Sequence, residues 1–115
     1  MLPEHPIERR LDSVSTINNL AGLYYAQGRY EAAEPLYQQV LELKRELLGE
    51  RHPDVASSLN NLGGLYRAQG HYAEAELLYQ QSLELSRELL GERHPQVAGS
   101  LNNLALLYNA QGRYY

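Results

Sequence analysis

Apolar side chains in the middle of the chain recur at intervals of three and four residues. Between residues 54 and 69 this stripe consists of Val55, Leu59, Leu62, Leu65 and Tyr66. A period near 3.6 residues is typical of an amphipathic helix, whereas a half-buried strand alternates at every second residue. Pro53 precedes the stripe and Gly70 follows it, and these residue types commonly begin and end helices. The pattern therefore predicts a helix over residues 54–69.

A second and wider apolar pattern follows directly. It starts near Tyr72, stops before Gly91, and contains Ala75, Leu78, Tyr79, Leu83, Leu85, Leu89 and Leu90. One neighbouring helix cannot cover so broad an apolar arc. We therefore expect a helix over residues 72–90 that packs both against its own partner and against a further pair.

The whole pattern repeats with a period of 42 residues. Residues 17–58 and 59–100 are identical at 31 of 42 aligned positions, and residues 101–115 begin a third copy. Periods of roughly 20–50 residues are typical of stacked repeats, whose units bury their apolar faces only against neighbours. The sequence thus predicts an all-α solenoid of antiparallel helix pairs, with five helices near residues 12–27, 30–48, 54–69, 72–90 and 96–111.

The two ends of the chain differ from the repeated part. Residues 1–11 contain prolines and charges without an evident helical stripe, so we predict a flexible leader before a repeat domain over residues 12–115. Asp12 aligns with Asp54, which places the first helix start close to it. The last predicted helix has no following partner for its apolar residues, which are Leu101, Leu104, Leu107 and Tyr108. Either the chain is part of a longer array, or another copy covers this edge.

The segment GERHP occurs at residues 49–53 and again at 91–95. Its histidine and glutamate are residue types that bind metals, but packed helices lie about 10 Å apart, whereas metal ligands must converge to about 2 Å. The sequence contains no HExxH helix, and no nucleophilic triad can be placed. We interpret GERHP as a helix stop joined to a helix start, with His52 and His94 as capping or loop residues. We expect no metal, no cofactor and no catalysis.

Composition narrows the classes of partner. The formal net charge is −4 with interspersed signs, which argues against nucleic acid or an anionic membrane, because both favour a basic surface. There is no cysteine, no signal peptide and no apolar run near the roughly 20 residues that span a bilayer. We therefore predict a cytoplasmic protein. The ten tyrosines, with no phenylalanine or tryptophan, bring a hydroxyl to every aromatic position.

The spacing of large, small and aromatic residues in each unit resembles the tetratricopeptide repeats. The residues that carry the resemblance are Ile17, Leu20, Ala21, Tyr24, Gly28, Tyr30, Ala33 and Tyr37, then Leu59, Leu62, Gly63, Tyr66, Gly70, Tyr72, Ala75 and Tyr79, then Leu101, Leu104, Ala105, Tyr108, Gly112 and Tyr114. The 42-residue variant, with LNNLAxLY and LGxxHPxVA, looks most like kinesin light chains. Ile or Leu replaces the family's frequent tryptophan, and the second helix runs on to Leu48 and Leu90. The resemblance implies a superhelix whose tyrosines at these positions belong to the core.

In that family the first helix of each unit lines a concave groove that holds extended peptides. The matching groove positions in this chain are Asn18, Tyr25, Asn60, Gly64, Arg67, Asn102 and Asn109, and the positions at the groove edge are Ser15, Asn19, Ser57, Asn61, Asn103 and Leu106. An asparagine amide both donates and accepts hydrogen bonds, so stacked asparagines can bracket peptide bonds. Alternatively, they hydrogen-bond neighbouring helices and hold the superhelix together.

Two groove positions vary in a way that bears on the ligand. Arg67 is the only cation among them, whereas kinesin light chains are known for basic pockets that favour acidic peptides. Tyr25 has no aromatic counterpart in the other units and is a candidate ligand contact. A mixed aromatic and polar peptide therefore fits this groove as well as an acidic one does.

Three functions follow as hypotheses. The first is a non-enzymatic protein–protein interaction scaffold that binds a peptide or partner helix in the concave groove. The second is a structural module that self-assembles as a homo-oligomer through its uncapped terminal helices. The third, RNA binding by a related helical repeat, fits poorly because the chain is acidic and has no basic stripe.

Overall fold

The computed structural model describes residues 6–112 and, within them, the side chains from residue 10 onward. This part of the chain forms five helices and no strand. The helices are α1 (Pro6–Ala26), α2 (Tyr30–Leu48), α3 (Pro53–Ala68), α4 (Tyr72–Leu90) and α5 (Pro95–Ala110). The predicted all-α repeat fold is confirmed, and the bounds of α2 to α5 agree with the sequence pattern to within one residue.

The predicted start of the first helix was wrong. α1 begins at Pro6, so residues 6–11 are helical and are not part of a flexible leader. The prediction relied on the alignment of Asp12 with Asp54, but the helix-starting dipeptide His-Pro lies at residues 5–6, earlier than the repeat would place it. The rest of the predicted leader, residues 1–5, lies outside the described residues.

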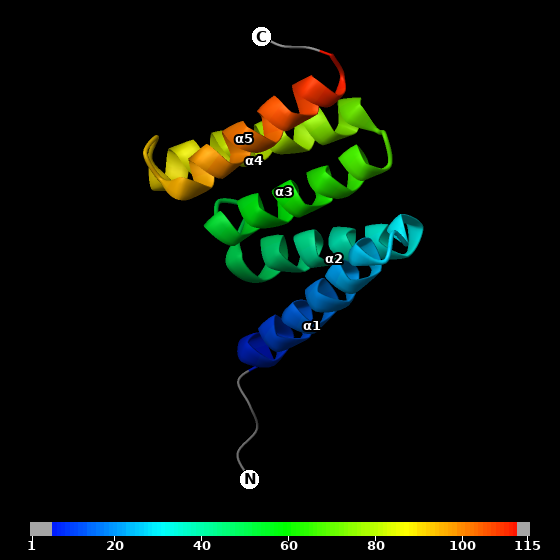
Figure 1. The fold of residues 1–115 in the computed structure, drawn as a ribbon. Coiled ribbons are helices and arrows are strands. Elements are labelled where there is room, and N and C mark those ends of the chain that lie inside the picture. The colour runs from blue at the N-terminus through cyan, green and yellow to red at the C-terminus, as the bar shows by residue number, and fades with distance from the viewer. Residues whose placement is uncertain (1–5, 113–115) are drawn as a thin grey trace.

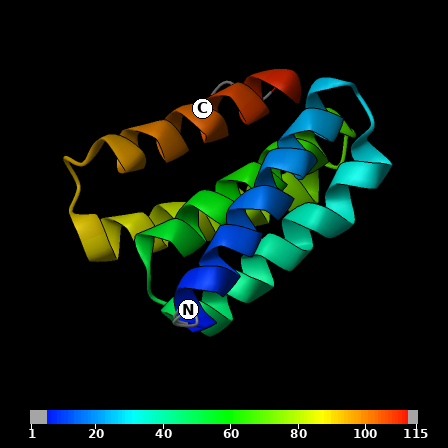
Figure 2. The same ribbon diagram turned by 90° about the horizontal axis from the view of Figure 1, so that it is seen from below.

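Consecutive helices run antiparallel and stack in the order of the sequence (Figures 1 and 2). α3 packs against both α2 and α4 and also touches α5, whereas α1 packs mainly against α2. The result is an elongated body of 58 × 34 × 18 Å. Each helix finds its partners among its neighbours in the chain, as the stacked-repeat pattern predicts.

Burial follows position in the stack. Leu65 of α3 and Leu107 of α5 are fully buried, because a preceding second helix covers them. The aligned Leu23 of α1 is 54% exposed, because no described helix covers that side of α1. Of the apolar residues of the last helix for which no following partner was expected, Leu104 and Leu107 are buried against the preceding helix α4, whereas Leu101 is exposed.

The first half of each GERHP segment ends a helix and folds back onto it. Gly49 and Gly91 have φ values of 95° and 87°, a backbone conformation that favours glycine, and each closes the preceding second helix. Glu50 pairs with Arg45 at 3.0 Å from Nε to Oε2. The same ion pair recurs one unit later, between Glu92 and Arg87.

The second half of GERHP starts the next helix. The His52 Nδ1 atom accepts a hydrogen bond from the backbone N–H of Asp54 at 3.0 Å, and Pro53 occupies the first helical turn. His94 caps α5 in the same way. The capping role predicted for both histidines is confirmed, and Arg51 additionally pairs with Glu88 of α4. The described residues contain no cluster of three or more metal-ligating side chains.

The tyrosines of the first helices connect neighbouring units. The Tyr66 hydroxyl of α3 donates to Glu34 of α2 at 3.5 Å and accepts from Gln38 at 3.1 Å. Tyr108 of α5 donates to Glu76 of α4 at 3.3 Å. These rings pack against the core clusters while their hydroxyls reach carboxylates at the surface, as amphipathic aromatic side chains commonly do.

Candidate functional site

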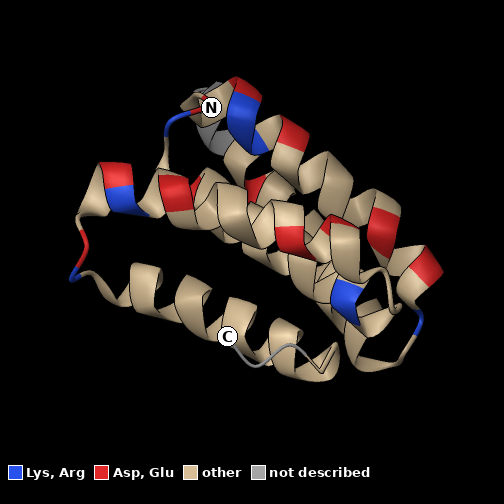
Figure 3. Ribbon diagram, turned by 90° about the horizontal axis from the view of Figure 1, so that it is seen from above, with Lys and Arg blue, Asp and Glu red and all other residues tan. Residues whose placement is uncertain are grey.

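The face formed by the first helices is almost free of charge. Figure 3 shows most of the charged residues on the second helices and on the loops. α5 has no charged residue, α3 has only Asp54 and Arg67, and α1 has none after Asp12. Arg67 therefore stands alone along most of this face.

A pocket of about 260 Å³ opens on this face around α3. It is lined by Tyr25, Tyr37, Asn60, Asn61, Gly64, Arg67, Tyr79 and Asn103. Four predicted groove residues, Tyr25, Asn60, Gly64 and Arg67, come together here from two helices. The predicted edge residues Asn61 and Asn103 complete the rim.

The remaining predicted residues lie outside this pocket. Ser15, Asn19, Asn102, Leu106 and Asn109 are exposed, and Asn18 and Ser57 are half-buried. The Ser57 hydroxyl donates to the backbone carbonyl of Pro53, one turn earlier in its own helix, at 3.4 Å. The structure thus gathers one half of the predicted site and leaves the other half dispersed along the face.

Asn60 is partly engaged with a neighbouring helix. Its Nδ2 donates to Ser100 of α5 at 3.2 Å, and Ser100 lies 3.4 Å from the Ser82 hydroxyl of α4. Ser82 in turn donates to the carbonyl of Ala56 at 2.8 Å. The Asn60 amide nitrogen therefore holds two helices together, as the alternative interpretation of the asparagines expects.

The equivalent junction in the first unit lacks this network. Val40 occupies the position of Ser82, and the Ser58 hydroxyl and the Asn18 Oδ1 are buried without a hydrogen-bond partner. Because Val40 offers neither a donor nor an acceptor, the link that Ser82 makes between Ser100 and the Ala56 carbonyl has no counterpart in this junction. A second difference adds to this contrast, because Gln96, which aligns with Asp54, donates to the Pro53 carbonyl at 3.0 Å.

Two pocket residues were missed as site residues, because their positions predicted core tyrosines. Tyr37 and Tyr79 belong to the second helices and are 9% and 2% exposed, yet both line the pocket. Glycines in the first helices lie beside both hydroxyls. A Cβ atom at Gly22 would lie 3.8 Å from the Tyr37 hydroxyl oxygen, and one at Gly64 would lie 3.6 Å from that of Tyr79. The unusual mid-helix glycines were the available signal.

Burial changes the acidity of both tyrosines. It raises the pKa of Tyr79 above 10.0, although the charge of Arg67 and its hydrogen bond to the Tyr79 side chain act in the opposite direction. Burial also raises the pKa of Tyr37, with a smaller contribution from Tyr25. Both phenols therefore stay neutral at physiological pH and serve as hydrogen-bonding groups, not as charges.

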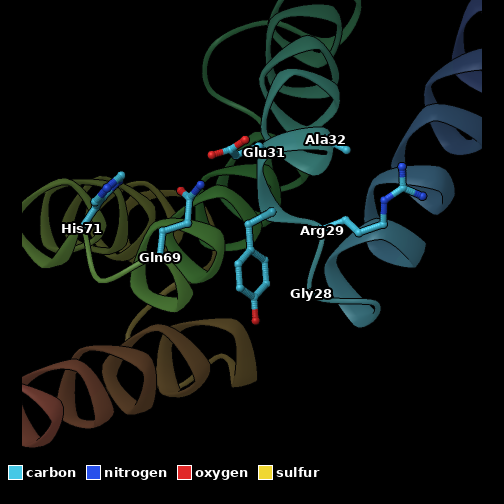
Figure 4. Close-up of a pocket in the computed structure, with 7 residues that line it drawn as sticks. Gly28, Arg29, Glu31, Ala32, Gln69 and His71 are labelled. Carbon is cyan, nitrogen blue, oxygen red and sulfur yellow. The ribbon is translucent and has the colours of Figure 1, made fainter.

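Two other cavities lie at the ends of the helices. The larger, about 650 Å³, is formed by the turns before α2 and α4 and is lined by Gly28, Arg29, Tyr30, Glu31, Ala32, Gln69 and His71. Figure 4 shows its Arg29 and His71 side chains on opposite sides, directed away from each other. Arg29 instead stacks on the Tyr24 ring, 4.5 Å from its centroid. This cavity gathers no convergent set of polar groups and none of the predicted groove residues.

The other cavity, about 300 Å³, lies at the opposite end, beside the first GERHP segment. It has an apolar floor of Val55, Leu59 and Leu85, and its charged rim includes Arg51 and Glu88, which pair with each other. Because the polar groups nearest the floor are already paired, we place the candidate site at the pocket around α3.

Comparisons with known proteins point to one family. The tetratricopeptide repeat family matches residues 12–88 and 78–114. The chain is similar to the crystal structure of BtubC (BKLC) from P. vanneervenii, with a TM-score of 0.80 and 29% identity over 96% of this chain. It is also similar to a putative kinesin light chain with nearly identical TPR-like repeats from Podosopora anserina, with a TM-score of 0.78 and 29% identity over 98% of this chain.

These relatives are longer than this chain. It covers 42% of the BtubC chain and 51% of the Podosopora anserina chain. A nucleotide-binding leucine-rich repeat (NLR)-like protein from Hyaloscypha variabilis is 49% identical over 37 residues, which is 32% of this chain and 4% of that protein. Among the described residues, none of the helices combines the length and apolarity that crossing a membrane requires.

Proposed function

Because the chain belongs to the tetratricopeptide repeat family, we propose that it is a non-enzymatic scaffold that holds an extended peptide or a partner helix against α1, α3 and α5. Proteins of this family are in general protein–protein interaction scaffolds. The observation that carries the proposal is the pocket around α3, where polar side chains from all five described helices converge on an otherwise uncharged face. We further propose a cytoplasmic location.

The accessible amides are the best suited to a peptide backbone. Asn61 and Asn103 line the pocket, and Asn102 and Asn109 are exposed on α5. Each amide offers two donors and an acceptor, so it pairs with a peptide bond whatever the adjacent side chain is. Asn60 contributes less, because its amide nitrogen is bonded to Ser100 and its Oδ1 is buried.

Apolar contacts flank the amides. Tyr25 lies at one side of the pocket, and Leu106, which is 47% exposed, lies on α5 where the other units carry Gly22 and Gly64. A tyrosine and a leucine at a recognition surface supply buried apolar area that fixes the peptide in place. The ligand that fits is a peptide that carries both polar and apolar side chains.

The test is a selection of peptides from a random phage-displayed library on the wild-type chain. Replacing Asn61 and Asn103 together by alanine should weaken the selected peptides by about tenfold or more, since each lost hydrogen bond contributes about 0.5–1.5 kcal/mol. Leu77→Ala is the matched control, because Leu77 is 61% exposed on α4, outside the pocket. Peptides that bind the double variant normally but lose affinity for the Leu77 variant would place the interaction on the other face.

A second candidate function is self-association through the end helices. Leu20 and Leu23 of α1 and Leu101 of α5 are 41%, 54% and 44% exposed, whereas their counterparts in α3, Leu62, Leu65 and Leu59, are 5%, 0% and 3% exposed. In α3 a neighbouring helix packs against the equivalent side chains, and a second copy of the chain can supply such a helix to α1 and α5. We propose it as the alternative to peptide binding.

Sedimentation equilibrium distinguishes the two functions. Replacing Leu23 and Leu101 by glutamate should abolish association and leave peptide binding unchanged. A wild-type chain that stays monomeric at millimolar concentration would exclude self-assembly.

A further inference from the structure

The outer face of α1, formed by Leu20, Leu23 and Tyr24, is the uncovered counterpart of a buried surface. α1 ends the described stack, with α2 on one side of it (Figure 1). Leu20 and Leu23 are 41% and 54% exposed. In α3 and α5, where a preceding second helix packs on the same positions, the aligned leucines are at most 7% exposed: Leu62, Leu65, Leu104 and Leu107.

The inner junctions also share a hydrogen bond from tyrosine to glutamate. Tyr66 of α3 donates to Glu34 of α2 at 3.5 Å, and Tyr108 of α5 donates to Glu76 of α4 at 3.3 Å. In both second helices a glutamine one turn later donates to the same carboxylate. A second helix therefore brings a carboxylate to a fixed place beside the leucine pair that it covers.

Tyr24 has the aligned position in α1 but lacks this acceptor. Within residues 10–112, no carboxylate accepts a hydrogen bond from its hydroxyl. The Arg29 guanidinium lies over the Tyr24 ring, 4.5 Å from the centroid, and none of the carboxylates in this part of the chain forms an ion pair with it. A carboxylate placed as in the inner junctions would meet both a hydroxyl donor and a positive charge.

We propose that the outer face of α1 binds an amphipathic helix of another protein chain, of the same kind as α2 and α4. The partner helix packs apolar side chains on Leu20 and Leu23, and one of its glutamates accepts a hydrogen bond from Tyr24. None of these three residues lines the pocket around α3, so this interaction is separate from peptide binding there.

A folded second copy of this chain fits the outer face less well. α2 lies between α1 and α3, and α4 lies between α3 and α5, so both second helices are already packed on two sides. The helix at the opposite end of a second copy is α5, which has no charged residue. α5 can cover the leucines, but it offers no carboxylate to Tyr24. The glutamate therefore distinguishes the proposed partner helix from α5 of a second copy.

The test is an NMR titration of the full chain with a terminally blocked peptide of residues 72–90, the sequence of α4. The chain is kept at a concentration where sedimentation equilibrium shows a monomer. We expect saturable shifts of the backbone amides of Leu20, Leu23 and Tyr24. Leu23→Glu should abolish these shifts. Leu77→Glu is the matched control, because Leu77 is a similarly exposed leucine on α4, and it should leave them unchanged.

A double-mutant cycle isolates the hydrogen bond. Tyr24→Phe should raise the Kd of the peptide by about three- to tenfold, the effect of losing one hydrogen bond. A peptide with Glu76→Ala should lose a similar factor against the wild-type chain. The two changes together should cost little more than either alone, because both remove the same bond. Far-UV circular dichroism and urea denaturation check that each variant is folded.

Three outcomes would overturn the proposal. Amides of α1 that do not respond up to the solubility limit of the peptide would remove the binding face. A Kd that is unchanged by both Tyr24→Phe and Glu76→Ala would exclude the glutamate contact. Shifts of the same amides that grow with the concentration of the chain alone, and that the peptide does not reverse, would assign the outer face to a second copy.

Discussion

The first and second units differ at eleven of their 42 aligned positions, and the change from Val40 to Ser82 alters the buried hydrogen bonds where each unit joins the next. After the second unit, Ser82 links the Ala56 carbonyl to Ser100, which also receives a hydrogen bond from Asn60. After the first unit, Val40 replaces the serine, and the hydroxyl of Ser58 stays buried without a partner.

This contrast shows that near-identical repeats need not have equivalent interiors. An unpaired buried hydroxyl costs about 1–3 kcal/mol, whereas a valine at the same place contributes apolar burial that a serine does not. Around Val40 the buried part of the first junction is stabilised by packing, whereas around Ser82 the second combines packing with a buried hydrogen-bonded network. Both junctions keep a hydrogen bond from tyrosine to glutamate nearer the surface. The two junctions therefore respond differently to the same mutation.

The same comparison explains why the candidate site lies on the second unit. Ala21 and Tyr25 of α1 correspond to Gly63 and Arg67 of α3. Gly63 lets the Tyr79 ring approach the α3 backbone, and Arg67 supplies the only charge in the pocket. These two differences between α1 and α3 place the polar pocket on the second unit.

The largest expected effect comes from aligned leucines with opposite environments. Leu65→Ala should lower the free energy of unfolding by about 2–5 kcal/mol, because it leaves a cavity in the centre of the stack. Leu23→Ala, at the matching position of α1, should change it by no more than about 0.5 kcal/mol, because Leu23 is exposed. Urea denaturation of the two variants checks this. A similar cost at both sites would show that a second copy covers α1 in solution.

The next effect concerns the glycines that face the second-helix tyrosines. Gly63→Ala should destabilise the chain by about 1–2 kcal/mol. The added methyl group clashes with the Tyr79 ring, and the energy of this clash exceeds the gain from the higher helix propensity of alanine. Gly22→Ala is the matched change in the first unit. Its Cβ would lie 3.8 Å from Tyr37, so it should stabilise the chain by up to about 1 kcal/mol. Equal thermal midpoints for the two variants would show that Tyr79 moves aside freely.

A smaller effect distinguishes the two junctions directly. Ser100→Ala should cost about 0.5–1.5 kcal/mol, because it removes the hydroxyl that pairs with Asn60 and Ser82. Ser58→Ala, the aligned change, should be neutral or slightly stabilising, because that hydroxyl has no partner. The midpoints of urea denaturation measure both. A loss at Ser58 equal to that at Ser100 would mean that the first junction is hydrogen-bonded after all.

The smallest effect is a loss of stability in alkali. The pKa values of Tyr37 and Tyr79 are raised in the folded chain, so the stability they contribute is fully present below pH 10.0. This stability is lost as the pH rises from 10.0 through the pKa values of the folded chain. The reason is that the two tyrosines ionise at lower pH in the unfolded chain than in the folded one. Phenolate absorbance should show late-titrating groups that disappear in Tyr37→Phe and Tyr79→Phe. Removal of both residues with no change in the titration curve would contradict the assignment.

The helices were predictable because their signals are local. The apolar stripe from Val55 to Tyr66 and the stops at Gly49 and Gly91 need only neighbouring residues to act, and both agree with the structure. The start of α1 was missed because the repeat alignment was given more weight than the dipeptide at residues 5–6. A helix can begin wherever a suitable first turn is available, whether or not the repeat has started.

The site was only partly predictable. Tyr25, Asn60, Gly64 and Arg67 were identified from the resemblance and do meet in one pocket. Tyr79 was assigned to the core, and its ring is indeed buried. The spacing of residues gives the side of a helix on which a side chain lies, but it does not give how far that side chain reaches past its neighbour.

The sequence by itself determined that this chain forms paired helices that stack, since periodicity, glycine stops and proline starts act over a few residues. Only the tertiary structure decided which buried hydroxyls find partners and which tyrosines reach the groove. The reason is physical: a hydrogen bond such as that from Ser82 to the Ala56 carbonyl depends on how closely two packed helices bring together residues that lie 26 positions apart in the chain. No pattern along the chain specifies that distance.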